Sequence, residues 1–185
     1  MKELKLIPPT DPRVNNAIAP FVDDMLKDED IKDRKELSEA MFFAMEKYGG
    51  IGLSANQVGL PFNMFVLGGH PSVEKGLKMT CFNPMIVSTS EEEVMMKEGC
   101  LTYPFIFLDI KRPRKVVVKY TDENGDLQEG HLDGMMSRIF QHEYDHMLGR
   151  NFTERVSKFK IKRAMDKRDK MLKKIEKSNK NGQKS

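Results

Sequence analysis

The stretch 133–148 constrains this chain more than any other part of the sequence. An acidic residue can cap its start, Gly149 follows its end, and apolar residues occur almost all the way round it, which predicts a central, buried helix. On a helix, His142 and His146 project from the same face, so both imidazoles can bind one metal ion. Glu143 directly follows the first histidine, and its carboxylate can reach a water molecule on that metal. This His-Glu-x-x-His arrangement is typical of metal-dependent hydrolysis, whereas the alternative interpretation is an ordinary solvated helical turn.

A hydrolytic metal needs a third protein ligand and an open position for water. One class of protease supplies a third histidine shortly after the motif, but Phe152 occupies that position here. Other proteases use a downstream glutamate; Glu154 is too close for this role, and Glu176 lies in a strongly basic tail. The remaining candidate is Cys100, which lies upstream in the segment 98–102.

The composition indicates a soluble globular protein that forms one domain, with room for an appendage. Of its 185 residues, 39% are apolar and 32% are charged. No apolar run approaches the roughly 20 residues of a membrane span, and the N-terminal segment lacks the features of a signal or transit peptide. We therefore expect a cytoplasmic location. Two cysteines, Cys81 and Cys100, do not make a disulfide framework, and we expect Cys81 to be buried in a strand.

Hydrophobic periodicity predicts a second helix over Asp33–Tyr48 and a weaker one near Val14–Ala19, within a proline-rich start. The segment Gly50–Gly59 is rich in glycine; it is either a plain loop or a place where backbone approaches another group closely. Asn124-Gly125 marks a hairpin. The predicted strands are Phe62–Leu67, Met79–Val87, Glu91–Met96, Ile106–Ile110, Lys115–Asp122 and Leu127–His131. These elements predict an α+β fold, in which mostly antiparallel β-sheets pack around the central metal-binding helix and a further helix lies at the C-terminus.

Three segments together resemble the peptide deformylase family. Gly50–Gln57 is similar to its G-x-G-L-A-A-x-Q motif, Glu98–Thr102 to E-G-C-L-S, and Gln141–His146 to Q-H-E-x-D-H. They occur in the family's order and near its spacing, and the resemblance runs over about 7–156. It implies an enzyme that removes the formyl group from the N-terminal formylmethionine of newly synthesised polypeptides and releases formate.

The resemblance also implies a metal centre. Cys100, His142 and His146 would bind one divalent ion, usually Fe²⁺ in this family, with Zn²⁺, Ni²⁺ or Co²⁺ able to replace it. A thiolate ligand cancels part of the metal's charge, so the bound water is acidified less than it would be by three neutral histidines. Glu143 is then needed as a general base, which later delivers the proton to the leaving amine.

The resemblance assigns further roles around the reacting carbonyl. The side-chain amide of Gln57 and the backbone N–H of Leu101 would donate hydrogen bonds to the developing oxyanion. Gly50 and Gly52 would let the extended substrate backbone lie against this loop by strand-like pairing, and Gly99 would also contact substrate.

The methionine side chain of the substrate needs an apolar pocket. By position, Ile51, Met96, Met135 and Ile139 would line it, with His142 at its edge. The sequence departs from the family at two places: at Arg138, where the family commonly has an apolar residue, and at Phe107, where many members are polar or basic. We expect the stem of Arg138 to cover the pocket while its charge reaches solvent.

Three other side chains receive predictions and two receive none. Asp145 either orients a ligating histidine or makes a surface or capping contact. Glu98 and Arg112 are expected to form a buried pair that holds the Cys100 strand. Ser54 and Thr102, which replace small family residues, receive no particular role.

The C-terminal segment differs in charge from the rest of the chain. Residues 155–185 carry 13 Lys and Arg against 3 Asp and Glu, whereas residues 1–154 carry 18 against 25, so their net charges are +10 and −7. We predict a catalytic domain over 1–154, a basic, sparsely apolar helix over 154–177, and disorder from 178 to 185. This tail can pack on the body as a solvated helix, bind RNA at the ribosome, or bind an anionic membrane surface. We expect a monomer that acts on nascent formylmethionyl peptides at the ribosome and not on membranes.

A non-enzymatic alternative is a binding module with a closed zinc site formed by Cys81, Cys100 and both histidines of the motif. Such a site would need neither Gln57 nor Glu143, yet both stand in their motifs. The sequence therefore favours the enzyme.

Overall fold

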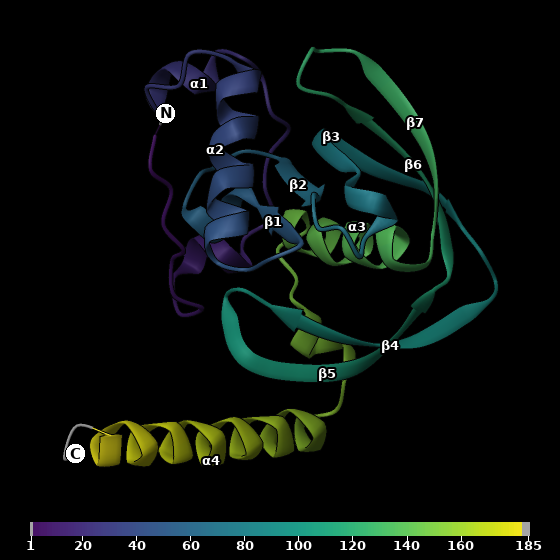
Figure 1. The fold of residues 1–185 in the computed structure, drawn as a ribbon. Helices are drawn as coiled ribbons and strands as arrows, with labels where there is room; N and C mark the ends of the chain where they lie inside the picture. The colour runs from purple at the N-terminus through teal and green to yellow at the C-terminus, as the bar shows by residue number, and fades with distance from the viewer. Residues whose placement is uncertain (1, 183–185) are drawn as a thin grey trace.

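The computed structural model describes residues 2–182 and shows the predicted α+β architecture (Figure 1). Five strands form an antiparallel sheet in the order β1-β2-β3-β6-β7, and two more, β4 and β5, form a separate antiparallel hairpin. The strands are β1 (Gly52–Ser54), β2 (Met64–Gly68), β3 (Lys78–Thr89), β4 (Glu93–Cys100), β5 (Tyr103–Pro113), β6 (Lys115–Thr121) and β7 (Leu127–Asp133). The α-helices are α1 (Met25–Asp28), α2 (Arg34–Lys47), α3 (Gly134–Met147) and α4 (Lys158–Gly182).

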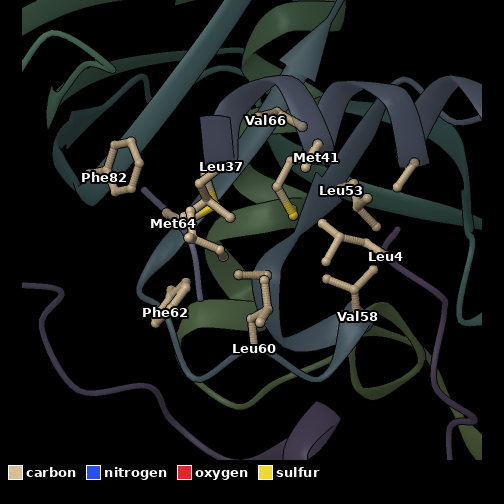
Figure 2. Close-up of a cluster of buried hydrophobic side chains, with 14 of the residues drawn as sticks. Leu4, Leu37, Met41, Leu53, Val58, Leu60, Phe62, Met64, Val66 and Phe82 are labelled. Atoms are coloured by element: carbon tan, nitrogen blue, oxygen red, sulfur yellow. The ribbon is translucent and has the colours of Figure 1, made fainter. Parts of the chain in front are cut away.

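Strand β2 shows how the core is layered. All five of its residues are buried, because the strand is covered on both faces. Met64 and Val66 point into the cluster formed with α2 (Figure 2), whereas Phe65 and Leu67 point into the cluster formed with α3. The sheet therefore lies between α2 and α3, which makes α3 the central helix that the sequence predicted.

Local sequence explains where these elements begin and end. The side chain of Asp33 accepts a hydrogen bond from the N–H of Glu36 at the start of α2, and Asp133 accepts one from Gly134 at the start of α3. Gly125 has a positive φ of 89° in the turn between β6 and β7, as the predicted hairpin requires.

One local prediction was wrong, one of two alternatives was excluded, and one turn was not predicted. The stretch 14–19 holds only the end of a 3-10 turn, η1 (Pro12–Asn15), because the backbone is already extended at Asn16. The segment Gly50–Gly59 is not a plain loop: it contains β1, which pairs with β2, and the 3-10 turn η2 (Ala55–Val58). A further 3-10 turn, η3 (Glu74–Gly76), lies between β2 and β3.

The C-terminal segment differs from the prediction at both ends. The side chain of Asn151 caps the 3-10 turn η4 (Phe152–Arg155), and the extended backbone of Val156 separates this turn from α4. Helix α4 then continues to Gly182, although disorder was predicted from 178; no glycine or proline interrupts it before that point. Residues 183–185 lie outside the described part. None of the helices within 2–182 is long and apolar enough to cross a membrane.

Candidate metal centre and active site

Helix α3 brings its polar motif into the interior of the protein. Gln141, His142, Glu143, Asp145 and His146 are all buried. Buried polar groups need hydrogen-bond or ionic partners, so the surroundings of each one indicate what it does.

Cys100, at the end of β4, lies beside the two histidines of α3. The candidate ligand atoms of Cys100, His142 and His146 all lie within 4.8 Å of one another, and the Cys100 Sγ is 3.4 Å from His146 Nε2. One sulfur and two imidazole nitrogens suit zinc or another transition metal, and three protein ligands are typical of catalytic sites that keep a position open. Cys81 is fully buried in the core, as predicted, and does not belong to this group, which argues against the closed zinc site.

The charges of this group act on metal binding in two opposite ways. Burial raises the pKa of the Cys100 thiol, but His146 and His142 lower it more, so the net pKa lies well below its ordinary value and the thiolate is favoured. Burial lowers the pKa of His142, but Cys100 and Glu98 raise it more, to about 10. An imidazole must be neutral to bind a metal, so metal binding would release this proton.

A buried carboxylate orients His142. Glu98 Oε2 lies 3.0 Å from His142 Nδ1, which leaves Nε2 free to face a metal. Arg112 donates to both oxygens of Glu98 at 2.7 and 2.8 Å, so the predicted buried pair is confirmed. Burial raises the pKa of Glu98, but Arg112 and His142 lower it more, so the carboxylate stays ionised.

Asp145 orients no histidine among the described residues, so the first of its two predicted alternatives was wrong. Its carboxylate accepts from Arg112 Nη1 at 2.7 Å and from Arg155 Nε and Nη2 at 2.7 and 2.6 Å. Both arginines bind the Asp145 carboxylate. Glu98, and not Asp145, is the carboxylate that orients His142.

Two residues that received no role in the sequence position Gln57. Its Oε1 accepts from the backbone N–H and the hydroxyl of Ser54, both at 2.9 Å. Its Nε2 donates to Thr102 Oγ1 at 3.0 Å and lies 3.3 Å from Cys100 Sγ. The amide is thereby aimed at the candidate metal centre. The sequence did contain a signal for this role, because positions 54 and 102 both carry small hydroxyl residues within the motifs.

Glu143 lies at the buried face of α3 against β1. Burial raises its pKa to about 7, and its Oε2 has no hydrogen-bond partner within the described part of the chain. A Cβ on Gly52 would lie 2.4 Å from Glu143 Oε1 and 2.7 Å from Ile139 Cγ2, so any side chain there would force one of these groups to shift. The backbone of Gly52 therefore lies close against α3, which is the kind of close approach predicted as one alternative for this segment.

Cys100, His142 and Glu143 line a cavity of about 810 Å³. Most of the predicted substrate-binding residues line it: Gly50, Ile51, Gly52, Gly99, Met135, Arg138 and Ile139, together with Gln57, Leu101, His142 and Glu143. Met96 is not part of this lining, although it shares a face of β4 with Glu98 and Cys100, which are. Phe107 is at the cavity and is exposed.

Arg138 differs most from its prediction. The residue is only 3% exposed, so its charge does not reach solvent. The guanidinium donates from Nη1 to Glu98 Oε1 at 2.7 Å and to the Ile110 carbonyl at 2.9 Å, and from Nη2 to the Val94 carbonyl at 2.7 Å.

Comparison with known proteins agrees with this geometry. The family model described as polypeptide deformylase matches residues 15–162. The chain belongs to the polypeptide deformylase family. It is 36% identical over 143 residues to the peptide deformylase of Aquifex aeolicus, covering 77% of this chain and 84% of that protein. It is 42% identical over 116 residues to that of Treponema pallidum, covering 63% and 68%.

Solved deformylase structures share the fold. A peptide deformylase from Ehrlichia chaffeensis in complex with actinonin has a TM-score of 0.78 and 34% identity, covering 92% of this chain and 98% of that one. A peptide deformylase from Thermotoga maritima has a TM-score of 0.74 and 30% identity, covering 85% and 99%. As a member of the polypeptide deformylase family, this chain is an enzyme, a metallohydrolase, and the resemblance seen in its three motifs is confirmed.

Proposed function

We propose that this enzyme removes the formyl group from the N-terminal formylmethionine of newly synthesised polypeptides and releases formate. The observation that carries the proposal is the convergence of Cys100, His142, Glu143 and Gln57 at one cavity, with His146 grouped beside Cys100 and His142. The family match supports the reaction, and the buried residues support particular roles in it.

Cys100, His142 and His146 would hold one divalent metal. We propose Fe²⁺ as the physiological ion, with Zn²⁺, Ni²⁺ or Co²⁺ as replacements; sulfur and imidazole ligands suit all four. Such an ion supplies Lewis acidity at the formyl oxygen and acidifies water. Glu98 would hold the His142 ring in the orientation that ligation needs.

Glu143 is the proton carrier in this proposal. It takes a proton from the attacking water and later delivers it to the nitrogen of the leaving amine. A pKa of about 7, raised by burial, suits a group that must both accept and donate a proton near neutral pH. Gly52 keeps the carboxylate in place by allowing backbone to pack directly against it.

Gln57 and the backbone N–H of Leu101 would stabilise the oxyanion that forms on the formyl carbonyl. Because Ser54 fixes the Oε1 end of the Gln57 amide, its Nε2 end stays directed toward the centre. One Nε2 hydrogen is occupied by Thr102, and the other faces the weak acceptor Cys100 Sγ, so it can shift to a carbonyl oxygen.

The peptide would lie along β1. This strand is at one edge of the five-stranded sheet, where an extended chain can add as a further strand. Gly50 and Gly52 lie at this edge and Gly99 across the cavity, while Ile51, Met135 and Ile139 would contact the first side chain.

The test is an assay of the Fe²⁺-loaded protein, kept anaerobic, on a formyl-Met peptide, with formate release as the readout. Glu143→Gln keeps the size of the side chain but cannot carry the proton, so we expect a loss of at least about 10²-fold in kcat. Thermal unfolding of the variant checks that it is folded. Equal rates for both proteins, or formate release after metal removal with a chelator, would refute the mechanism.

We further propose that α4 contacts the ribosome, that residues 1–154 form the catalytic unit, and that the protein acts as a cytoplasmic monomer. Lys170, Lys173, Lys174 and Lys177 are exposed on the distal half of α4, beyond the part that packs against β5. Replacing these four by Gln should weaken ribosome binding and lower its salt dependence. The slope of the logarithm of the binding constant against the logarithm of the salt concentration should become less steep by up to about 0.7–0.9 for each phosphate that the variant no longer neutralises.

A matched control replaces exposed lysines elsewhere, such as Lys32 and Lys35 near the start of α2. Ribosome affinity that is equal for the wild type and the α4 variant would contradict this contact. A preference of α4 for anionic vesicles over ribosomes would favour the membrane alternative.

A further inference from the structure

Phe107 places an exposed aromatic ring at the cavity beside the candidate metal centre. The residue lines this cavity and is nevertheless 59% exposed. Within the β4–β5 hairpin it is paired with Gly99, and a Cβ on Gly99 would lie 2.8 Å from Phe107 Cε1. The ring therefore lies directly over the backbone of Gly99, in the space that a side chain at position 99 would fill.

The two faces of the hairpin have different surroundings. Side chains of paired residues in antiparallel strands lie on the same face, and successive side chains along a strand alternate between faces. Glu98 is buried and bonds to Arg138 and His142, so its face is turned toward α3. Gly99 and Phe107 form the next pair along the hairpin, and they belong to the opposite face, which is turned away from α3.

The apolar surface around this ring is small and borders the cavity. Pro104 and Phe105, which precede the ring in β5, are exposed and also line the cavity. In the other direction, the next pair on the same face is Lys97 and Asp109, which are exposed and charged. An apolar surface of this extent, open to the cavity and bounded by charges, suits one side chain of a bound peptide better than a protein partner.

We propose that Phe107 is a specificity-determining residue, which makes the enzyme prefer a large apolar side chain at the second residue of the formyl peptide. The inference rests on the proposed function, in which the extended peptide lies along β1 with Gly99 across the cavity. The first side chain then points toward α3, where Met135 and Ile139 line the cavity. Because side chains of an extended chain alternate, the second points to the opposite face, on which the Phe107 ring lies.

The chemistry of this contact sets the expected preference. A second side chain such as phenylalanine would cover part of the exposed ring and would lose part of its own hydration, which favours binding. Two aromatic rings in contact gain further from their preferred relative orientations. Alanine is too short to make this contact. Because the contact is remote from the reacting carbonyl, it should be as strong in the ground state as in the transition state, so its effect should appear in KM more than in kcat.

The experiment measures kcat and KM for formyl tripeptides that begin with methionine and carry phenylalanine or alanine at the second position. We expect kcat/KM of the wild type to be at least about fivefold higher for the phenylalanine peptide. In Phe107→Ala this ratio should fall at least about threefold, mainly through KM. A second pair of peptides carries the same two residues at the third position. Since the third side chain points back toward α3, that ratio should change by less than about twofold.

Phe43→Ala is the matched control. Phe43, on α2, is 52% exposed, which is close to the exposure of Phe107, but it does not line the cavity. This variant should leave both ratios as in the wild type. Should Phe107→Ala not fold, as judged by thermal unfolding, Phe107→Thr replaces it; threonine is favoured in strands, also lacks the ring, and should show the same fall in the second-position ratio.

The outcomes separate the inference from the function on which it rests. Absence of formate release from every peptide by the metal-loaded wild type would overturn the proposed function. Release that depends on metal and Glu143, with a second-position ratio that is the same in the wild type and the folded Phe107 variant, would overturn only the role of Phe107. A fall confined to the third-position ratio would also overturn it, because the ring would then contact the other side of the peptide.

Discussion

Helix α3 meets the rest of the molecule through two contrasting surfaces. On its apolar side it packs on the five-stranded sheet through hydrophobic side chains of both elements: Phe65, Leu67, Met136, Ile139 and Phe140. On its ionic side it meets the β4–β5 hairpin through buried charges: Glu98, Arg112, Arg138 and Asp145. His142 and His146 come from the helix, whereas Cys100 comes from the hairpin.

The contrast shows how the third ligand is placed. Apolar contacts have no preferred direction and depend on the area buried, so they hold two elements together without fixing them strictly. Charge-assisted hydrogen bonds have defined directions and lengths. We infer that the apolar side stabilises α3 on the sheet and that the ionic side sets the position of the hairpin, and hence of Cys100, relative to the histidines.

The largest effect is expected at the centre of the ionic side. Glu98→Gln removes the carboxylate shared by Arg112 and Arg138 and leaves both cations with less compensation. Removal of one partner from one buried pair costs about 3–5 kcal/mol, so we expect a loss of at least about 5 kcal/mol in the free energy of unfolding, measured with denaturant. A loss below about 1 kcal/mol would mean that this side does not hold the hairpin.

A second substitution sharpens this test. Most of the cost should come from the unpaired cations, so adding Arg138→Met to Glu98→Gln should restore part of the stability. A double variant whose loss equals the sum of the two single losses would contradict this explanation.

On the apolar side, the largest single effect is expected at Phe140. Its ring is fully buried and packs edge-on against Phe65, with 5.0 Å between ring centroids. Phe140→Ala should cost about 3–5 kcal/mol in the free energy of unfolding, because it leaves a cavity that neighbours fill only in part. Adding Phe65→Ala should increase the loss and restore nothing. If the double variant were more stable than Phe140→Ala, the apolar side would respond as the ionic side does, and the contrast between the two sides would be lost.

The apolar side of α3 could be predicted from the sequence better than the ionic side. Helical periodicity and a capping residue identified α3 and its buried position, and contiguous motifs identified Cys100, His142 and His146 as residues that the structure brings together. Motifs of adjacent residues can be recognised without knowledge of the fold. The roles proposed for these residues remain predictions.

The ionic side was harder to predict because its bonds join distant positions. Arg138 bonds to the backbone carbonyls of Val94 and Ile110, and a carbonyl has no signature in the sequence. Arg155 reaches Asp145 from η4, a separate turn that follows the end of α3. The break before α4 likewise depends on a side-chain cap by Asn151, which competes with the helical pattern of the following residues.

A smaller effect on stability is expected at Gly52, which packs against Glu143, the proposed general base. In Gly52→Ala the methyl group would overlap Glu143 Oε1 and Ile139 Cγ2, so α3 or the carboxylate must shift. We expect a loss of about 1–3 kcal/mol in the free energy of unfolding, together with a kcat lower by at least about tenfold, roughly the effect of misplacing a catalytic group. Gly130→Ala in β7 is the control, because its methyl group meets only Val118 and Leu132, at 3.3 and 3.7 Å. Unchanged kcat in a folded Gly52→Ala protein would show that Glu143 tolerates displacement.

The smallest effect is expected at the exposed end of the ionic side. Arg155 donates two hydrogen bonds to Asp145, but its side chain is 38% exposed, so water can replace these bonds and salt can screen them. Asp145 also keeps Arg112, which is fully buried. Arg155→Gln should therefore cost only about 0.5–1 kcal/mol in the free energy of unfolding, and less at about 1 M salt. Lys160→Gln, at an exposed position on α4, is the control. A loss as large as that of Glu98→Gln would place the anchor of the hairpin at this end, and the C-terminal segment would then help to position Cys100.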